Sequence, residues 1–156
     1  MTAPSDNRDS QLPGGQLLPR LIALQRDAST AGDLIVMQAM ADIPFAIRRV
    51  YFIHGIPEWA VRGGHAHRRC HEVVVAAEGA MTVTLEAQDG SQHRFRLAET
   101  TTGLYVPPLY WRTVSDYRPA SLCLVLASED YDPTEYLRDR DEFRRFGLPP
   151  DAHPVS

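Results

Sequence analysis

The stretch RGGHAHRRCHEVVVAAEG, at residues 62–79, holds the strongest signal in this chain. Its histidines His65 and His67 are two residues apart, so in an extended chain both side chains point to the same side of a strand. A β-branched run follows at residues 73–75, and Gly79 ends it. Strand ends that face the interior of a small β-barrel are where such barrels keep their pockets. The stretch therefore predicts a site that holds either a metal or a pair of proton-transfer groups.

The length and composition of the chain fit a single globular domain. It has 156 residues, of which 23% are charged and 44% hydrophobic, and this length can bury one sizeable core. We assign residues 17–148 to that domain, residues 1–16 to a disordered N-terminal tail and residues 149–156 to a C-terminal tail. The N-terminal tail is polar and lacks the basic and apolar regions of a signal peptide. We therefore expect a cytoplasmic protein.

Charge and residue usage argue against several classes of partner. The net charge of −4 does not suggest nucleic acid, and no apolar run reaches the ~18 residues that a membrane span requires. All 16 basic residues are arginine. An anionic ligand must therefore be held by arginines or backbone amides, and a Schiff base on lysine is impossible. Cys70 and Cys123 match no zinc or redox spacing and are expected to be buried free thiols.

Short alternating segments separated by turn signals predict an all-β fold. The expected strands are residues 17–24, 33–39, 47–53, 71–77, 81–87, 92–98, 103–106, 111–117 and 121–128. Strands at this spacing are typical of a β-sandwich or small barrel, such as the cupin-type jelly roll, which is a double-stranded β-helix. Residues 55–64 are expected to form a loop. One C-terminal helix is expected at residues 133–146, with Asp132 as its N-cap and Gly147 at its end.

The histidine stretch resembles the first sequence motif of cupins, H-x-H-x4-E-x6-G, through His65, His67 and Glu72. In metal cupins these residues, with a histidine from a second motif, bind a divalent metal such as iron, nickel, manganese or zinc. The second motif should lie at residues 103–112, but Arg112 stands near the place of its histidine. A guanidinium does not ligate a metal and repels one. Three possible ligands remain, which weakens the metal site without excluding it.

Proton transfer is the second interpretation of the histidine pair. A neutral imidazole, with a pKa near ~6.5, is suited to moving protons at neutral pH. Two imidazoles on one face of a pocket could take a proton from one carbon and return it to the next, with Tyr51 orienting the base or donating to a carbonyl. Arg62, Arg68 and Arg112 could hold a phosphate or a developing oxyanion. A third possibility is that the histidines are structural and do no chemistry.

Five blocks of the sequence resemble the dTDP-4-keto-6-deoxyhexose 3,4-ketoisomerases. They lie, in order and with similar spacing, at residues 43–53, 62–68, 103–111, 124–132 and 136–143. The resemblance implies a cupin jelly roll that needs no metal or other cofactor and forms a homodimer, often with exchanged N-terminal strands. It also implies an isomerase of deoxysugar and polysaccharide biosynthesis. Its substrate would be a dTDP-linked 4-keto-6-deoxyglucose, which it would convert into the 3-keto isomer.

The resemblance also implies roles for individual residues. His65 is the catalytic base, and His67, Tyr51 and Arg62 match the other residues of the family's site. The base would remove the proton from C3, which the neighbouring C4 ketone acidifies, and give an enediolate. We expect Tyr51 and an arginine to stabilise its oxygen charge. Protonation at C4 by His65 or His67 would complete the isomerisation.

Ligand contacts and two departures from the family pattern complete the prediction. Thymine is expected to stack on Trp111 or Tyr105, while arginines neutralise the diphosphate. Many relatives carry glutamine where this chain has Glu72, and histidine where it has Arg112. We predict that these two residues form a charge pair across adjacent strands. Two other functions stay open, namely a metal-dependent cupin oxidoreductase and a non-catalytic protein that binds sugar nucleotides.

Overall fold

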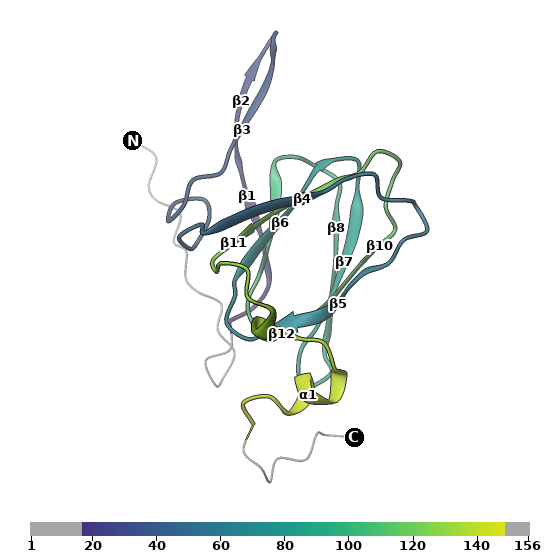
Figure 1. The fold of residues 1–156 in the computed structure, drawn as a ribbon. Coiled ribbons are helices and arrows are strands. Elements are labelled where there is room, and N and C mark those ends of the chain that lie inside the picture. The colour runs from purple at the N-terminus through teal and green to yellow at the C-terminus, as the bar shows by residue number, and fades with distance from the viewer. Residues whose placement is uncertain (1–16, 149–156) are drawn as a thin grey trace.

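The computed structural model describes residues 17–148, so the two expected tails lie outside the described residues. Two five-stranded antiparallel sheets face each other (Figure 1). The first sheet has the order β1 (Arg20–Ala23), β9 (Thr102–Val106), β6 (Glu72–Glu78), β11 (Leu122–Ala127) and β4 (Arg49–Ile53). The second has the order β12 (Tyr136–Leu137), β5 (Arg62–His67), β10 (Trp111–Ser115), β7 (Met81–Glu86) and β8 (Gln92–Leu97). This architecture confirms the predicted jelly-roll class of fold.

The alternation of side chains along the strands explains how the layers are held together. In β6, Val74 points between the sheets, where it shares a buried cluster with Val83 of β7. Its neighbour Val73 faces the other way and packs with Phe45 on the outer side of the first sheet. Each such aliphatic side chain contributes about 1.5–3 kcal/mol when fully buried. The middle of the first sheet is therefore covered on both faces, and its inner face forms one wall of the core. On the edge strand β4, Val50 and Phe52 stay exposed on the outer face.

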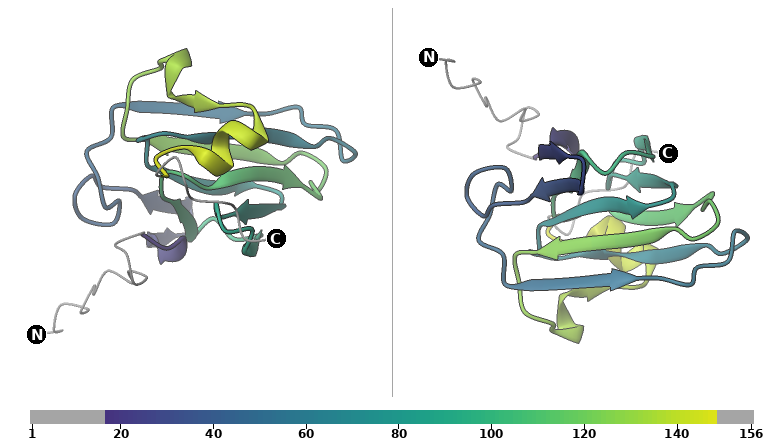
Figure 2. Two further views of the ribbon diagram at one scale, coloured as in Figure 1. Left: turned by 90° about the horizontal axis from the view of Figure 1, so that it is seen from below. Right: turned by 90° about the horizontal axis from the view of Figure 1, so that it is seen from above.

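The C-terminal segment differs from the predicted helix. Residues 133–146 contain a 3₁₀ turn (η1, Pro133–Glu135), the strand β12 and a short helix, α1 (Arg140–Arg145). Asp132 caps only the 3₁₀ turn, and Asp139 caps α1. Pairing of β12 with β5 overrides the helical tendency of the sequence, because it buries Leu137 against the second sheet. Figure 2 (left) shows α1 lying across this side of the molecule. No helix within residues 17–148 is long and apolar enough to cross a membrane.

A hairpin of β2 (Gln25–Ser29) and β3 (Gly32–Val36) projects away from the sandwich (Figure 1). Every residue of β2 is exposed, and only the last two residues of β3 are partly buried. The strand predicted at residues 33–39 is found as β3, but its partner was not predicted because QRDAS has no apolar alternation. Two strands without a shared core are at best marginally stable in water. The hairpin is therefore not stabilised by its own two strands alone.

Candidate active site

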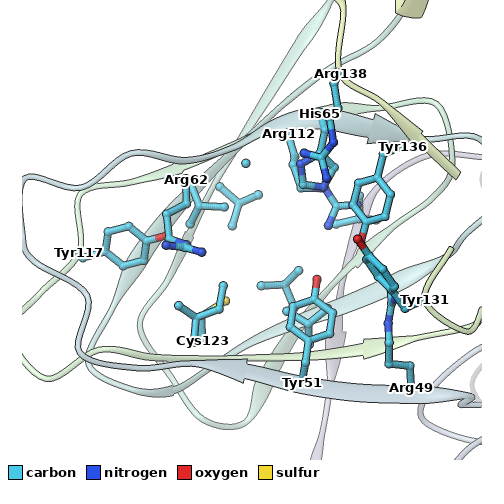
Figure 3. Close-up of a pocket in the computed structure, with 17 residues that line it drawn as sticks. Arg49, Tyr51, Arg62, His65, Arg112, Tyr117, Cys123, Tyr131, Tyr136 and Arg138 are labelled. Carbon is cyan, nitrogen blue, oxygen red and sulfur yellow. The ribbon is translucent and has the colours of Figure 1, made fainter. Parts of the chain in front are cut away.

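A cavity of about 450 Å³ lies between the two sheets. Its polar lining comes from β4, β5, β10, β11 and β12 and from nearby loops (Figure 3). These lining residues are Arg49, Tyr51, Arg62, His65, Arg112, Tyr117, Cys123, Tyr131, Tyr136 and Arg138. The remaining wall is mostly valine. An apolar cavity of this size with a few converging polar groups is typical of a small-molecule binding site.

Two glycines place His65 at this cavity. Gly63 and Gly64 have φ values of +94° and +70°, which β-carbon-bearing residues rarely adopt. They form a bulge, so that His65 pairs with Arg112 while Gly63 pairs with the next residue of β10. A β-carbon at Gly63 would lie 2.6 Å from the backbone oxygen of Arg112. β-Bulges often re-aim a side chain beside an active site. β5 begins at Arg62, so its residues 62–64 lie within the segment that was predicted from the sequence to be a loop.

The two histidines lie on the same side of β5, as predicted, but they are not equivalent. Their ring centroids are 5.2 Å apart in an edge-on arrangement. His65 lines the cavity, whereas His67 is 2% exposed and does not line it. The ring of Tyr136 lies 5.0 Å from that of His65 and 4.6 Å from that of His67. The structure therefore presents one histidine to a ligand and places the second behind it.

Burial keeps both imidazoles neutral. It lowers the pKa of His65 to about 3 and that of His67 to about 2, and the nearby positive charge of Arg112 acts in the same direction. Within residues 17–148, His65 Nδ1 is buried without a hydrogen-bond partner. A neutral imidazole has a free lone pair at neutral pH, so His65 can accept a proton from a ligand in the cavity.

Glu72 links the two sheets beneath the cavity. It is fully buried and forms an ion pair with Arg112, which is 6% exposed. Tyr51 Oη donates a hydrogen bond to Glu72 Oε1 over 3.1 Å. His67 Nε2 lies 3.3 Å from the same oxygen without hydrogen-bond geometry. The predicted Glu72–Arg112 pair is therefore present, but it joins β6 and β10 across facing sheets and not across adjacent strands.

The residues around Glu72 do not fit a metal site. Both carboxylate oxygens of Glu72 are engaged, one by the hydroxyl of Tyr51 and the other by the guanidinium of Arg112. In the described part of the chain, no three histidine, cysteine, aspartate or glutamate side chains converge on one point. A buried cation beside the two histidines also raises the electrostatic cost of a divalent metal. We therefore derive no step through a metal.

Three residues predicted to bind substrate do not line the cavity. Trp111 packs 5.7 Å from the Phe143 ring beneath α1, because it neighbours Arg112 in β10 and so faces the opposite side of the sheet. Tyr105 lies on the outer face of the first sheet, where its hydroxyl is 2.8 Å from His71 Nδ1. Arg68 follows the end of β5 and pairs with Glu142 at 2.9 Å.

Several residues that line the cavity were not predicted. Arg49 is two residues before Tyr51 in β4, so the period of the strand could have placed both on one face. Tyr136 and Arg138 were assigned to a helix, which concealed their position at the edge of β5. Tyr131 comes from the loop before η1 and carries no periodic signal. These four residues give the cavity a cationic and aromatic end (Figure 3).

Comparison with known proteins identifies the class of enzyme. A curated protein from Aneurinibacillus thermoaerophilus, TDP-4-oxo-6-deoxy-alpha-D-glucose-3,4-oxoisomerase, is 33% identical over 128 residues, which cover 81% of this chain and 91% of the relative. The 3,4-ketoisomerase QdtA from Thermoanaerobacterium thermosaccharolyticum was solved as a His-to-Asn mutant in complex with TDP-4-keto-6-deoxyglucose. It is 34% identical, superposes with a TM-score of 0.78, and the match covers 81% of this chain and 91% of QdtA.

The TDP-quinovose 3,4-ketoisomerase WlaRB from Campylobacter jejuni is 30% identical with a TM-score of 0.77, over 81% of this chain and 97% of WlaRB. The fold, the histidine site and these relatives together define a cupin-type sugar-nucleotide 3,4-ketoisomerase. A protein family described as "FdtA: WxcM-like, C-terminal" matches residues 18–147. The chain belongs to this family.

Proposed function

We propose that this enzyme converts TDP-4-keto-6-deoxyglucose into a TDP-linked 3-keto-6-deoxyhexose, with His65 as the base. The observation that carries the proposal is a neutral imidazole in the cavity, next to a buried guanidinium and a phenol. TDP-4-keto-6-deoxyglucose is the ligand bound to the mutant QdtA, which supports it as substrate here. A hydroxyketone placed against such a base can be isomerised without a change in overall oxidation state.

The proposed reaction moves one proton between neighbouring carbons. His65 takes the proton from C3, and the electron pair of that C–H bond forms the C3–C4 double bond of an enediolate. The charge that develops on O4 is stabilised by Arg112, which lines the cavity close to His65. The hydroxyl proton of O3 is transferred to O4, which leaves a ketone at C3 as a proton is added to C4. His65 faces the cavity and is the proposed source of that proton.

Tyr51 and His67 have supporting roles in this proposal. Burial raises the pKa of Tyr51, so its hydroxyl stays protonated and can donate a hydrogen bond to a ligand oxygen. In the structure it donates to Glu72. His67 lies edge-on to His65 with the ring centroids 5.2 Å apart, and together with the ring of Tyr136 at 5.0 Å it packs against His65 and holds its orientation. We therefore favour His65 over His67 for both proton transfers.

The test is the His65→Asn variant with TDP-4-keto-6-deoxyglucose, and formation of the 3-keto product is followed by NMR. We expect at least a ~100-fold loss of turnover, the range typical of general base catalysis, with unchanged thermal stability and unchanged TDP affinity. His93→Asn, at a histidine outside the cavity, is the matched control and should keep full activity. Full turnover by His65→Asn would show that His65 is not the base. Stoichiometric iron, nickel or manganese in protein purified without chelators would support the metal-dependent alternative.

We also propose that the enzyme acts as a homodimer with exchanged N-terminal strands. The β2–β3 hairpin has no core of its own, and Leu34 on it is 61% exposed. Leu21 of the edge strand β1 is 51% exposed. A second copy that covers this end would supply the missing contacts. Light scattering should give a dimer for the wild type and a monomer for Leu34→Asp, while the control Leu148→Asp stays dimeric. A monomeric wild type contradicts the proposal.

The expected cytoplasmic location stays a prediction. Cys70 and Cys123 are both buried free thiols in the structure, as a reducing compartment would keep them. Fractionation of the source cells, followed by immunodetection, is the direct test. Recovery of the enzyme outside the cytoplasmic fraction would contradict it.

A further inference from the structure

Glu135 is a buried carboxylate that the proposed mechanism does not use. It is the last residue of η1, directly before β12, and it is only 5% exposed. Burial alone would raise the pKa of Glu135, but hydrogen bonds from Arg69 and Cys70 outweigh that effect and lower the pKa below its usual value. Glu135 is therefore ionised at neutral pH. Hydrogen bonds to an ionised acceptor are about twice as strong as neutral ones.

The bonds of Glu135 tie the segment before β12 to the turn that follows β5. Its Oε2 accepts hydrogen bonds from the backbone N–H groups of Arg69 and Cys70 over 3.0 and 3.1 Å. Its Oε1 accepts one from Arg69 Nε over 2.8 Å, but that side chain is 74% exposed, so water weakens the pair. Its backbone oxygen accepts a bond from the N–H of Arg68 over 2.9 Å. The carboxylate thus provides a charged, buried acceptor for two backbone N–H groups of the turn.

The strand β12 depends on this anchor because it has only two residues. Tyr136 pairs with His67 and Leu137 pairs with Ala66, along the edge of β5 (Figure 1). Leu137 is fully buried and holds the far end of the strand, while Glu135 holds the near end. The side chain of Tyr136, between these two anchors, lines the cavity. The position of that ring is therefore set from both sides.

The ring of Tyr136 packs against the proposed base. Its centre lies 5.0 Å from that of the His65 ring and 4.6 Å from that of the His67 ring. Figure 3 shows Tyr136 and His65 at the same end of the cavity. A base that removes a proton from carbon must be well aligned with the C–H bond, and a displacement of about 1 Å can cost about 100-fold in rate. A shift of Tyr136 would therefore reach the chemistry through His65.

We propose that Glu135 is a positioning residue of the isomerase, which holds the ring of Tyr136 against His65 through β12 and so keeps the base aligned. The inference rests on the proposed function, in which His65 is the base. Glu135 does not line the cavity, so it acts on a bound substrate only through the segment that it anchors. Its loss should slow the turnover of bound substrate in a protein that remains folded, because Leu137 and the two sheets keep their contacts.

The experiment measures kcat for TDP-4-keto-6-deoxyglucose at saturating substrate, with the full-length protein and well below the melting temperature of each variant. Glu135→Ala should lower kcat about 10- to 100-fold. Glu135→Gln keeps a neutral acceptor for the two backbone N–H groups and should stay within about 5-fold of the wild type. Arg69→Ala is the matched control. It removes the exposed ion pair and leaves both backbone bonds, so kcat should stay within about 2-fold of the wild type.

A double-mutant cycle with Tyr136→Leu separates positioning from a general structural role. Residues that act through one another are not additive, so Glu135→Ala should cost less than about 2-fold once the Tyr136 ring is gone. Loss by the same factor in both backgrounds overturns the proposal. An unchanged kcat in Glu135→Ala, or an equal loss in Arg69→Ala, overturns it as well. If Glu135→Ala does not fold, Glu135→Asp, whose carboxylate is one methylene shorter, replaces it in the cycle with the same expectation.

The NMR signal of the His65 ring gives a second readout that does not depend on catalysis. In histidine-labelled protein, the signal that disappears in His65→Asn belongs to His65. It should shift in Glu135→Ala and stay in place in Arg69→Ala. If the signals behave in this way but the wild type does not isomerise TDP-4-keto-6-deoxyglucose, the proposed function alone is refuted. If the wild type is active and Glu135→Ala changes neither the His65 signal nor kcat, the positioning role alone is refuted.

Discussion

The replacement Glu72→Gln tests whether the buried charge network holds the two sheets together. Gln has nearly the volume of Glu, so the change removes the charge and leaves the packing. Arg112, 6% exposed, would then be a buried cation without its counterion. Breaking a buried ion pair by removing one partner costs about 3–5 kcal/mol. For a chain of this length, about 2–4 °C of melting temperature is lost per kcal/mol. We therefore expect the melting temperature to fall by about 6–20 °C.

Denaturant unfolding followed by fluorescence gives the free energy directly, and Glu78→Gln is the matched control. Glu78 is in the same strand but exposed, so its replacement should change stability by no more than ~0.5 kcal/mol. The double replacement of Glu72 and Arg112 by glutamine should recover part of the loss, because no unpaired charge remains. A Glu72→Gln variant within ~1 kcal/mol of the wild type would refute the reasoning.

Further predictions concern the site and its strand. Tyr51→Phe should lower kcat by about 10- to 100-fold and leave TDP affinity unchanged, measured by steady-state kinetics and calorimetry. Because the folded pKa values of His65 and His67 lie below ~6.5, the unfolded chain takes up protons first as pH falls. Their stabilisation is therefore complete above pH ~6.5 and is lost toward pH ~3, by about 1.4 kcal/mol per pH unit for each group. In denaturant melts at several pH values below ~6.5, His67→Asn should lower the slope by the ~1.4 kcal/mol per pH unit of one group; an unchanged slope contradicts the assignment. Gly63→Ala should destabilise the protein far more than Gly64→Ala, since only the former meets a backbone oxygen; equal melting temperatures would contradict this.

The fold could be predicted because its strands carry their own periodic signals. Residues 71–77 and 81–87 alternate or run apolar in the sequence, and they form β6 and β7 within one or two residues of the expected ends. β2 could not be found in this way, because all of its residues are exposed. The helix predicted from Asp132 failed for a different reason. Strand pairing with β5 decides the conformation of residues 136–137, and local capping signals do not report such long-range pairing.

The candidate site could be predicted only in part. The spacing of His65 and His67 correctly placed both on one side of a strand, but it could not show that His67 is buried behind His65. Trp111 was chosen for its aromatic ring, although the alternation of β10 puts it on the face opposite Arg112. The cationic and aromatic end of the cavity combines Arg49 of β4 with Tyr131, Tyr136 and Arg138, which follow β11 and are far from Arg49 in sequence. Its members converge only through the fold.

The central claim is that His65 moves protons between C3 and C4 of a bound nucleotide sugar. The most direct measurement is incubation of TDP-4-keto-6-deoxyglucose with the enzyme in deuterated water, followed by NMR of the sugar carbons. We predict that the wild type forms the 3-keto product and places solvent deuterium on C3 or C4, and that His65→Asn does neither. Binding of the sugar nucleotide by the wild type with neither 3-keto product nor deuterium on the ring would contradict the claim.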